Sequence, residues 1–244
     1  LVLPLVYVIY TALREGWKVF VSSVTDEYAV KSIFLTVKVT VITVIINSVF
    51  GIFAAWLITR FKFRGKKLIS TLIDLPLTIS PIIAGLIFVL TFGRQSAIYP
   101  FLEKWGIQII FAVPGIVLAT IFVTFPFISR EIIPVLTVKG TDEEEAAALM
   151  GANGFQIFTQ ITFPHIRWAF LYGVVLCSAR AMGEFGAVSV LSGHLSGITN
   201  TMPLYIELLY QAFDFTGAFA MSAILVVMAL VILVLKNIFE KSME

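Results

Sequence analysis

The chain has 244 residues, of which 59% are hydrophobic and 13% are charged, and its mean hydropathy is +0.99. Soluble domains carry about a quarter charged residues, so a chain this apolar cannot be a soluble protein and must face lipid. The formal net charge is only +2, and no basic run with interleaved aromatic residues occurs, which argues against a nucleic-acid partner. The single cysteine, Cys177, excludes an intrachain disulfide.

Long apolar runs predict membrane-spanning helices, each of which needs roughly 20 mostly apolar residues. Continuous runs favour helices over the alternating strands of a barrel. We expect five full spans, at residues 33–59, 68–92, 109–128, 168–191 and 215–235. We interpret the shorter run 1–13 as a sixth span that is cut at its N-terminal end. The sequence therefore predicts an all-α polytopic membrane protein with about six spans.

The Lys and Arg residues outside the spans predict the orientation, because cytoplasmic loops are rich in them. Ten of the 17 lie in the segment 60–67, in or beside the long loop 130–167, and at the C-terminus. Five lie on the other side, and two fall within predicted spans. We therefore expect the second and fourth connections to be cytoplasmic and, with six spans, both termini as well.

The polar segment 130–162 between the fourth and fifth spans is too long for a simple turn. Its residues Thr141 to Glu144 fit a capping box at a helix start, and Gly151 is a natural helix stop. Thr162, followed closely by Pro164, suits the start of the next helix. The segment therefore predicts a cytoplasmic helix–turn–helix.

One motif in this segment resembles the EAA loop of binding-protein-dependent ABC importer permeases; its residues are Glu145, Ala146, Ala147, Gly151, Ile161 and Pro164. The family usually has Leu before the proline, where this chain has Phe163. The resemblance implies a coupling helix that docks into a groove on an ATPase subunit. Small alanines allow close approach, Gly151 permits the turn, and Glu145 can pair with a group on the ATPase. The alternative interpretation is an ordinary capped surface helix.

Longer stretches resemble the W-type permease subunit of the sulfate/thiosulfate branch, at residues 73–81, 106–115, 122–126, 179–189, 192–194 and 199–201. The resemblance implies one type I importer permease domain over 1–244, with 130–162 as its coupling loop. It also implies transport of sulfate or thiosulfate across the bacterial cytoplasmic (inner) membrane by alternating access. Molybdate and tungstate permeases share a similar stretch around Arg180, so these anions remain the alternative.

The same resemblance implies the partners of the chain, which are a second homologous permease subunit, two ATPase subunits and an external sulfate-binding protein. This chain has no phosphate-binding loop of its own, since Gly65-Lys66-Lys67 lacks the Ser or Thr that follows the Lys of such loops. We therefore expect no catalysis and no cofactor in this chain, with ATP and Mg²⁺ used by the ATPase.

Two charged residues, Arg180 and Glu184, fall inside the fifth predicted span, four apart and therefore on one helix face. We favour a structural ion pair near the gate, in a packing region that includes Gly186. A substrate-binding arginine is the alternative, although a substrate that must leave quickly should not meet a strong unpaired cation. Small residues at every fourth position predict a close helix contact here: Ala179, Gly183 and Ala187.

Two other function classes compete with this hypothesis. An ion-coupled secondary transporter would show midplane acids or broken helices in symmetry-related halves, and no such internal repeat is visible. A membrane enzyme would need a nucleophile–base or metal constellation, to which His165 and His194, far apart in the sequence, contribute little; we expect no metal site.

Overall fold

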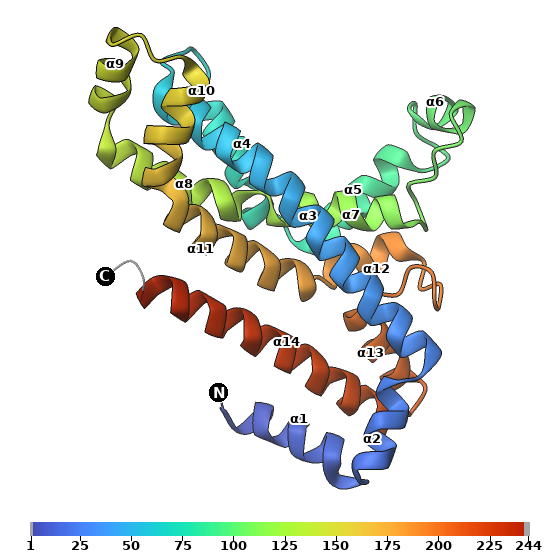
Figure 1. The fold of residues 1–244 in the computed structure, drawn as a ribbon. Coiled ribbons are helices and arrows are strands. Elements are labelled where there is room, and N and C mark those ends of the chain that lie inside the picture. Colours follow the sequence, from blue (N-terminus) through green and yellow to red (C-terminus); the bar gives the residue numbers. More distant parts are fainter. Residues whose placement is uncertain (1, 242–244) are drawn as a thin grey trace.

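The computed structural model describes residues 2–241, which form helices joined by turns with no strand among them (Figure 1). The expected all-α class is therefore confirmed. The elements are α1 (Val2–Arg14), α2 (Trp17–Val24), α3 (Glu27–Arg60), α4 (Lys66–Thr78), α5 (Pro81–Phe92), α6 (Tyr99–Lys104), α7 (Val113–Thr124), α8 (Pro126–Lys139), α9 (Asp142–Leu149), α10 (Gly154–Ile157), the π-helical turn η1 (Phe158–Thr162), α11 (Phe163–Met182), α12 (Gly186–Ser192), α13 (Met202–Gln211) and α14 (Phe215–Lys241).

Three helical stretches in the described chain are long and apolar enough to cross a membrane unaided. They are α3, the stretch Val113–Lys139 formed by α7 and α8, and the Phe215–Leu235 part of α14. The spans predicted at 33–59 and 215–235 are thereby confirmed.

The span predicted at 109–128 is displaced along the chain, to Val113–Lys139. It starts late because Phe111 has a positive φ of 58° and its N–H donates to the Leu191 carbonyl instead of a helical one. It ends late because Pro126 lies in the first turn of α8, where a missing N–H does no harm. The residues just beyond 128 therefore continue a span and do not begin a loop.

Two other predicted spans, at 68–92 and 168–191, are formed by bent pairs of helices, and the bends were not predicted. Within the first, α4 and α5 meet at 110°, because Pro81 disfavours helical backbone at the residue before it. Within the second, the helix that ends at Met182 meets α12 at 50°. If each bent pair crosses once, the described chain contains up to five spans.

The run predicted as a sixth span forms α1, whose apolar part Leu3–Arg14 is shorter than the roughly 20 residues that cross a bilayer. Three short helices were not predicted at all: α2, α6 and α13. Of these, α13 belongs to the core, because Met202 and Tyr205 pack with Met221 of α14.

The centre of the molecule is formed by α3, α8 and α11, which share a core that includes Ala55, Ile128 and Ile166. Gly51 and Gly173 allow the close approach, because a Cβ on either would lie 2.9 Å from an atom of Ile128. The hairpin of α9 and α10 lies at one end of this bundle and α6 at the other (Figure 1). The start of α1 and the end of α14 lie toward the side of α9 and α10.

Candidate functional site

The EAA-like motif folds as a helical hairpin, in which α9 ends at a turn and α10 with η1 returns to the bundle. Gly151 has a φ of +90°, and its N–H donates to the Ala148 carbonyl at 3.0 Å. The next N–H, of Ala152, donates to the Ala147 carbonyl at 3.0 Å. This is the Schellman arrangement, in which a left-handed glycine ends a helix, so the expected stop at Gly151 is observed.

The predicted capping box at Thr141 does not form. The Thr141 hydroxyl donates to Glu145 Oε1 at 2.7 Å and makes no bond to a backbone N–H. Glu144, the expected partner of Thr141 in the capping box, instead contacts residues that are more distant in the sequence. A capping box occurs instead at the second helix, where Asn153 and Gln156 exchange bonds of 2.9 Å with each other's backbone N–H.

The predicted helix start at Thr162 is also wrong, since the backbone is helical without interruption from α10 through η1 into α11. The π-helical turn immediately precedes the Phe163–Pro164 pair. A Pro inside a helix removes one ladder hydrogen bond, and wider turns of this kind are one means of accommodating such a break.

The residues of the EAA-like motif differ in their exposure to solvent. Glu145, Ala146 and Pro164 are exposed, whereas Ala147 is buried and Ile161 is half-buried. Beside them, three large apolar side chains are exposed on the hairpin: Leu149, Met150 and Phe155. They flank the turn at Gly151, so the tip of the hairpin presents apolar surface next to a carboxylate.

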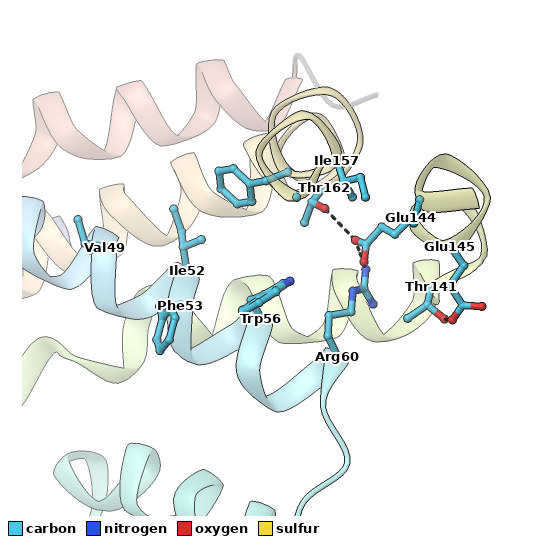
Figure 2. A pocket seen from close by; sticks show the side chains of 13 residues that line it. Val49, Ile52, Phe53, Trp56, Arg60, Thr141, Glu144, Glu145, Ile157 and Thr162 are labelled. Atoms are coloured by element: carbon cyan, nitrogen blue, oxygen red, sulfur yellow. Dashed lines mark hydrogen bonds and ion pairs between the residues drawn. The ribbon is translucent and has the colours of Figure 1, made fainter. Parts of the chain in front are cut away.

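An ion pair that the sequence analysis missed connects the hairpin to the bundle (Figure 2). Arg60 Nη2, at the end of α3, lies 2.8 Å from Glu144 Oε1. The same oxygen accepts a hydrogen bond of 2.8 Å from the Thr162 hydroxyl, and Arg60 Nη1 donates to the Leu136 carbonyl at 3.0 Å. The only sequence signal was an Arg directly after the predicted span 33–59 and an acidic helix start elsewhere in the chain.

A second contact on the hairpin joins Glu143 Oε2 to His165 Nε2 at 2.7 Å. The hydrogen bond to His165, and then its charge, lower the pKa of the Glu143 carboxyl. Both groups are accessible to solvent, so this contact is worth less than the buried pair.

A cavity of about 720 Å³ lies between α3 and the hairpin. Its apolar wall consists of residues such as Val49, Phe53 and Trp56, and Arg60 with Glu144 lies at its polar end (Figure 2). The cavity separates the C-terminal part of α3 from α10 and η1.

The predicted pair in the fifth span is brought together, with Arg180 Nη1 2.6 Å from Glu184 Oε2. The contact is an ion pair, and Glu184 Oε2 makes no hydrogen bond. The packing face predicted through Gly183 is wrong, because the helix ends there and a Cβ on Gly183 would meet only the Ala179 carbonyl, at 3.7 Å. Gly186 does pack closely, since its Cβ would lie 3.0 Å from Pro81 of α5.

Within residues 2–241, no group of three or more His, Cys, Asp or Glu side chains lies close enough to hold a metal ion. His165 and His194 belong to different parts of the fold, one on the hairpin side of α11 and the other after α12.

Comparisons with known proteins show which family has this arrangement. The chain is 46% identical over all of its length to "Sulfate transport system permease protein CysW" of Escherichia coli (strain K12), of which it covers 84%. It is 46% identical over 99% of its length to the CysW protein of Synechocystis sp., of which it covers 87%. It is 42% identical over 98% of its length to "Sulfate permease 2, chloroplastic" of Chlamydomonas reinhardtii, covering 65% of that protein.

Solved structures share the fold at low sequence identity. A bacterial alginate ABC transporter, in complex with its pentasaccharide-bound periplasmic protein, matches with a TM-score of 0.79 at 19% identity, over 99% of this chain and 88% of that one. An amino acid ABC transporter with histidines matches with a TM-score of 0.63 at 18% identity, over 91% of this chain and 98% of that one. The family described as "Binding-protein-dependent transport system inner membrane component" matches residues 47–244. This chain therefore belongs to the family of binding-protein-dependent transport system inner membrane components and has the type I importer permease fold.

Proposed function

We propose that this chain is the membrane-spanning permease subunit of an ATP-driven importer that moves sulfate or thiosulfate across the bacterial cytoplasmic membrane. Its likeness to CysW proteins, which the names of those relatives describe as sulfate transport permeases, supports the choice of substrate. Molybdate and tungstate are tetrahedral oxyanions like sulfate, so the test of this proposal compares these ions.

The observation that carries the importer function is the hairpin of α9 and α10. Its tip exposes Leu149, Met150 and Phe155, which are large apolar side chains outside the spans. Exposed apolar clusters rimmed by polar residues mark protein interaction sites. The occupant in this proposal is the ATPase subunit, with Glu145 paired to one of its basic or amide groups and Ala146 allowing close backbone approach.

The complex in this proposal contains this chain, a second homologous permease subunit, two ATPase subunits and an external sulfate-binding protein. ATP and Mg²⁺ are used by the ATPase subunits, and this chain performs no covalent chemistry. ATP binding closes the ATPase pair and moves the hairpin, and this movement exposes the transport pathway to the two sides of the membrane in turn. Within the region 130–162, the part that follows α8 acts as the coupling segment, and both chain termini lie in the cytoplasm.

Reconstitution tests this function directly. The complex, expressed with its neighbouring permease, ATPase and binding-protein genes, is placed in liposomes, and sulfate uptake is measured with and without ATP. Molybdate and tungstate are offered as competitors. We expect ATP-dependent sulfate uptake that excess molybdate does not abolish. Uptake without ATP, or uptake driven by an ion gradient, would contradict the proposal.

The docking role is tested in the same complex. Leu149→Ser and Phe155→Ser should each reduce the amount of ATPase that co-purifies with the permease, because they remove apolar contact area and leave no cavity behind. Trp105→Ser is the matched control, since Trp105 is equally an exposed apolar residue but lies beside α6, at the other end of the bundle. It should leave co-purification unchanged.

A further inference from the structure

The pair of Arg60 and Glu144 joins four separate segments of the chain. Arg60 ends α3, Glu144 lies on α9, Leu136 is on α8, and Thr162 closes η1. One carboxylate oxygen receives both the Arg60 guanidinium and the Thr162 hydroxyl, and the guanidinium also donates to the Leu136 carbonyl. The hairpin is therefore connected to α3 and α8 through two side chains.

Both side chains of this pair are largely buried, unlike those of the pair that joins α8 to α4, in which Arg130 and Asp74 are 55% and 40% exposed. The side chains of Arg60 and Glu144 are 8% and 16% exposed, whereas those of Lys31 and Glu27, at the opposite end of α3, are 48% and 73% exposed. Charges removed from water interact more strongly and are screened less by salt. The buried pair can therefore hold a fixed geometry, which an exposed pair cannot.

The rest of α9 is loosely attached. Ala147 is its one buried residue among those described. The helix is flanked by Gly140 and Gly151, which both have positive φ, and a Cβ on either would meet nothing within 4 Å. Since neither glycine is held by packing, the position of α9 depends on side-chain contacts, which are the buried pair of Glu144 with Arg60 and the solvent-accessible contact of Glu143 with His165.

The cavity also lies between the hairpin and α3. Because about 720 Å³ of space separates α3 from α10 and η1, side-chain packing there does not fix the distance between the hairpin and the bundle. The pair at the polar end of the cavity does so (Figure 2).

We propose that Arg60 and Glu144 are positioning residues that fix the coupling hairpin to α3, so that movement imposed on the hairpin is passed to the membrane-spanning helices. This inference rests on the proposed function, because it assumes that an ATPase moves the hairpin. A pair that only stabilised the fold could be replaced by uncharged side chains of similar size without consequence for transport.

The test is the double variant Arg60→Met with Glu144→Gln in the reconstituted complex. It removes both charges, so no buried charge is left unpaired, and the amide oxygen introduced by Glu144→Gln can still accept the hydrogen bond from the Thr162 hydroxyl. Only the connection to α3 and α8 is lost. Each single variant should lower the yield of complex, and the double variant should restore it. Sulfate imported per ATP hydrolysed should fall about fivefold or more, the lower range of coupling between distinct sites.

The matched control is Lys31→Met with Glu27→Gln, which removes the exposed pair at the other end of the same helix. It should import sulfate per ATP at the wild-type ratio. If the Arg60/Glu144 double variant also keeps the wild-type ratio, the pair is only structural and the proposal is overturned. Sulfate-dependent ATP hydrolysis by the wild-type complex is measured first. If the wild-type complex shows none, that result contradicts the proposed function instead.

A second measurement leaves the pair unaltered and so does not depend on the folding of its variants. Spin labels at Lys62→Cys and Asp142→Cys, in a Cys177→Ser background, report the distance between the end of α3 and the start of α9. We expect the same narrow distance distribution with and without ATP. A nucleotide-dependent change in this distance would mean that the hairpin moves against α3, and it would overturn the proposal.

Discussion

Glu184 accepts a hydrogen bond from the Ala187 N–H at 2.8 Å through one carboxylate oxygen and lies 2.6 Å from Arg180 Nη1 through the other. Its side chain is 1% exposed, whereas that of Arg180 is 33% exposed. The two contacts connect the end of α11 to the first turn of α12 across their 50° bend. The carboxylate therefore fixes the direction in which the chain continues after α11.

We first predict that Arg180→Ala lowers the thermal stability of the complex and that adding Glu184→Gln restores a large part of it. The single variant leaves a buried carboxylate unpaired, which costs about 3–5 kcal/mol for a fully buried pair and less here because Arg180 is partly exposed. The amide introduced by Glu184→Gln carries no charge and still accepts the Ala187 N–H. Melting curves of the purified complex measure both effects.

The alternative role of Arg180 predicts a different pattern. If its guanidinium contacted the transported anion, Arg180→Ala would leave stability intact and would raise the sulfate concentration needed for half-maximal uptake. The second substitution would then restore nothing, and we would abandon the structural pair.

The second prediction concerns orientation. From the distribution of basic residues we expect Lys66 and Asn153 to be cytoplasmic and Lys104 to be external. Single cysteines at these positions, in a Cys177→Ser background, should react with a membrane-impermeant reagent in intact cells only at position 104. Labelling at position 153 from outside would show that the chain has the opposite orientation in the membrane.

The third prediction concerns the turn in the hairpin. Gly151→Val should reduce the amount of bound ATPase, because a side chain in left-handed backbone costs about 1–2 kcal/mol and would change the angle between α9 and α10. Gly154→Val is the control, since both glycines have open space around them but only Gly151 has a positive φ. Equal ATPase binding by the two variants would mean that the turn angle is unimportant.

The fourth prediction concerns Glu145. Its substitution by Lys should leave the protein inserted in the membrane but abolish sulfate-dependent ATP hydrolysis, because the partner group on the ATPase would meet a like charge. Asp142→Lys is the matched control, an exposed acid in the same first turn of α9 with the same change of charge. Normal hydrolysis by the Glu145 variant would exclude a docking contact there.

The fifth prediction separates two glycines by their surroundings. Gly85→Ala should destabilise the protein by about 1–3 kcal/mol, the usual cost of overpacking, because its Cβ would lie 2.7 Å from the Ala187 carbonyl. Gly183→Ala should be tolerated, since its Cβ would lie 3.7 Å from the Ala179 carbonyl and meet no other helix. Equal melting temperatures for the two variants would show that α5 and α12 can separate without cost.

Properties that depend on composition and on short segments could be predicted from the sequence. The long apolar runs identified α3 and α14 as spans, because a bilayer requires continuous apolar length regardless of the neighbouring helices. The stop at Gly151 was predictable for a similar reason, since a left-handed helix end depends on one residue and its own turn.

The remaining features depend on contacts between distant segments, which one sequence does not reveal. Thr141 to Glu144 satisfies the capping-box pattern, yet Glu144 turns to Arg60, 84 residues away, because a buried cation attracts the carboxylate more strongly than an exposed backbone amide does. The bend at Gly183 likewise depends on Glu184 and on the packing of Gly186 against α5. The order of residues along the chain was thus enough to establish a helical membrane protein with a hairpin in one loop. The bends of the helices and the pairing of the charges arise only in the folded chain, because both depend on partners that folding brings together.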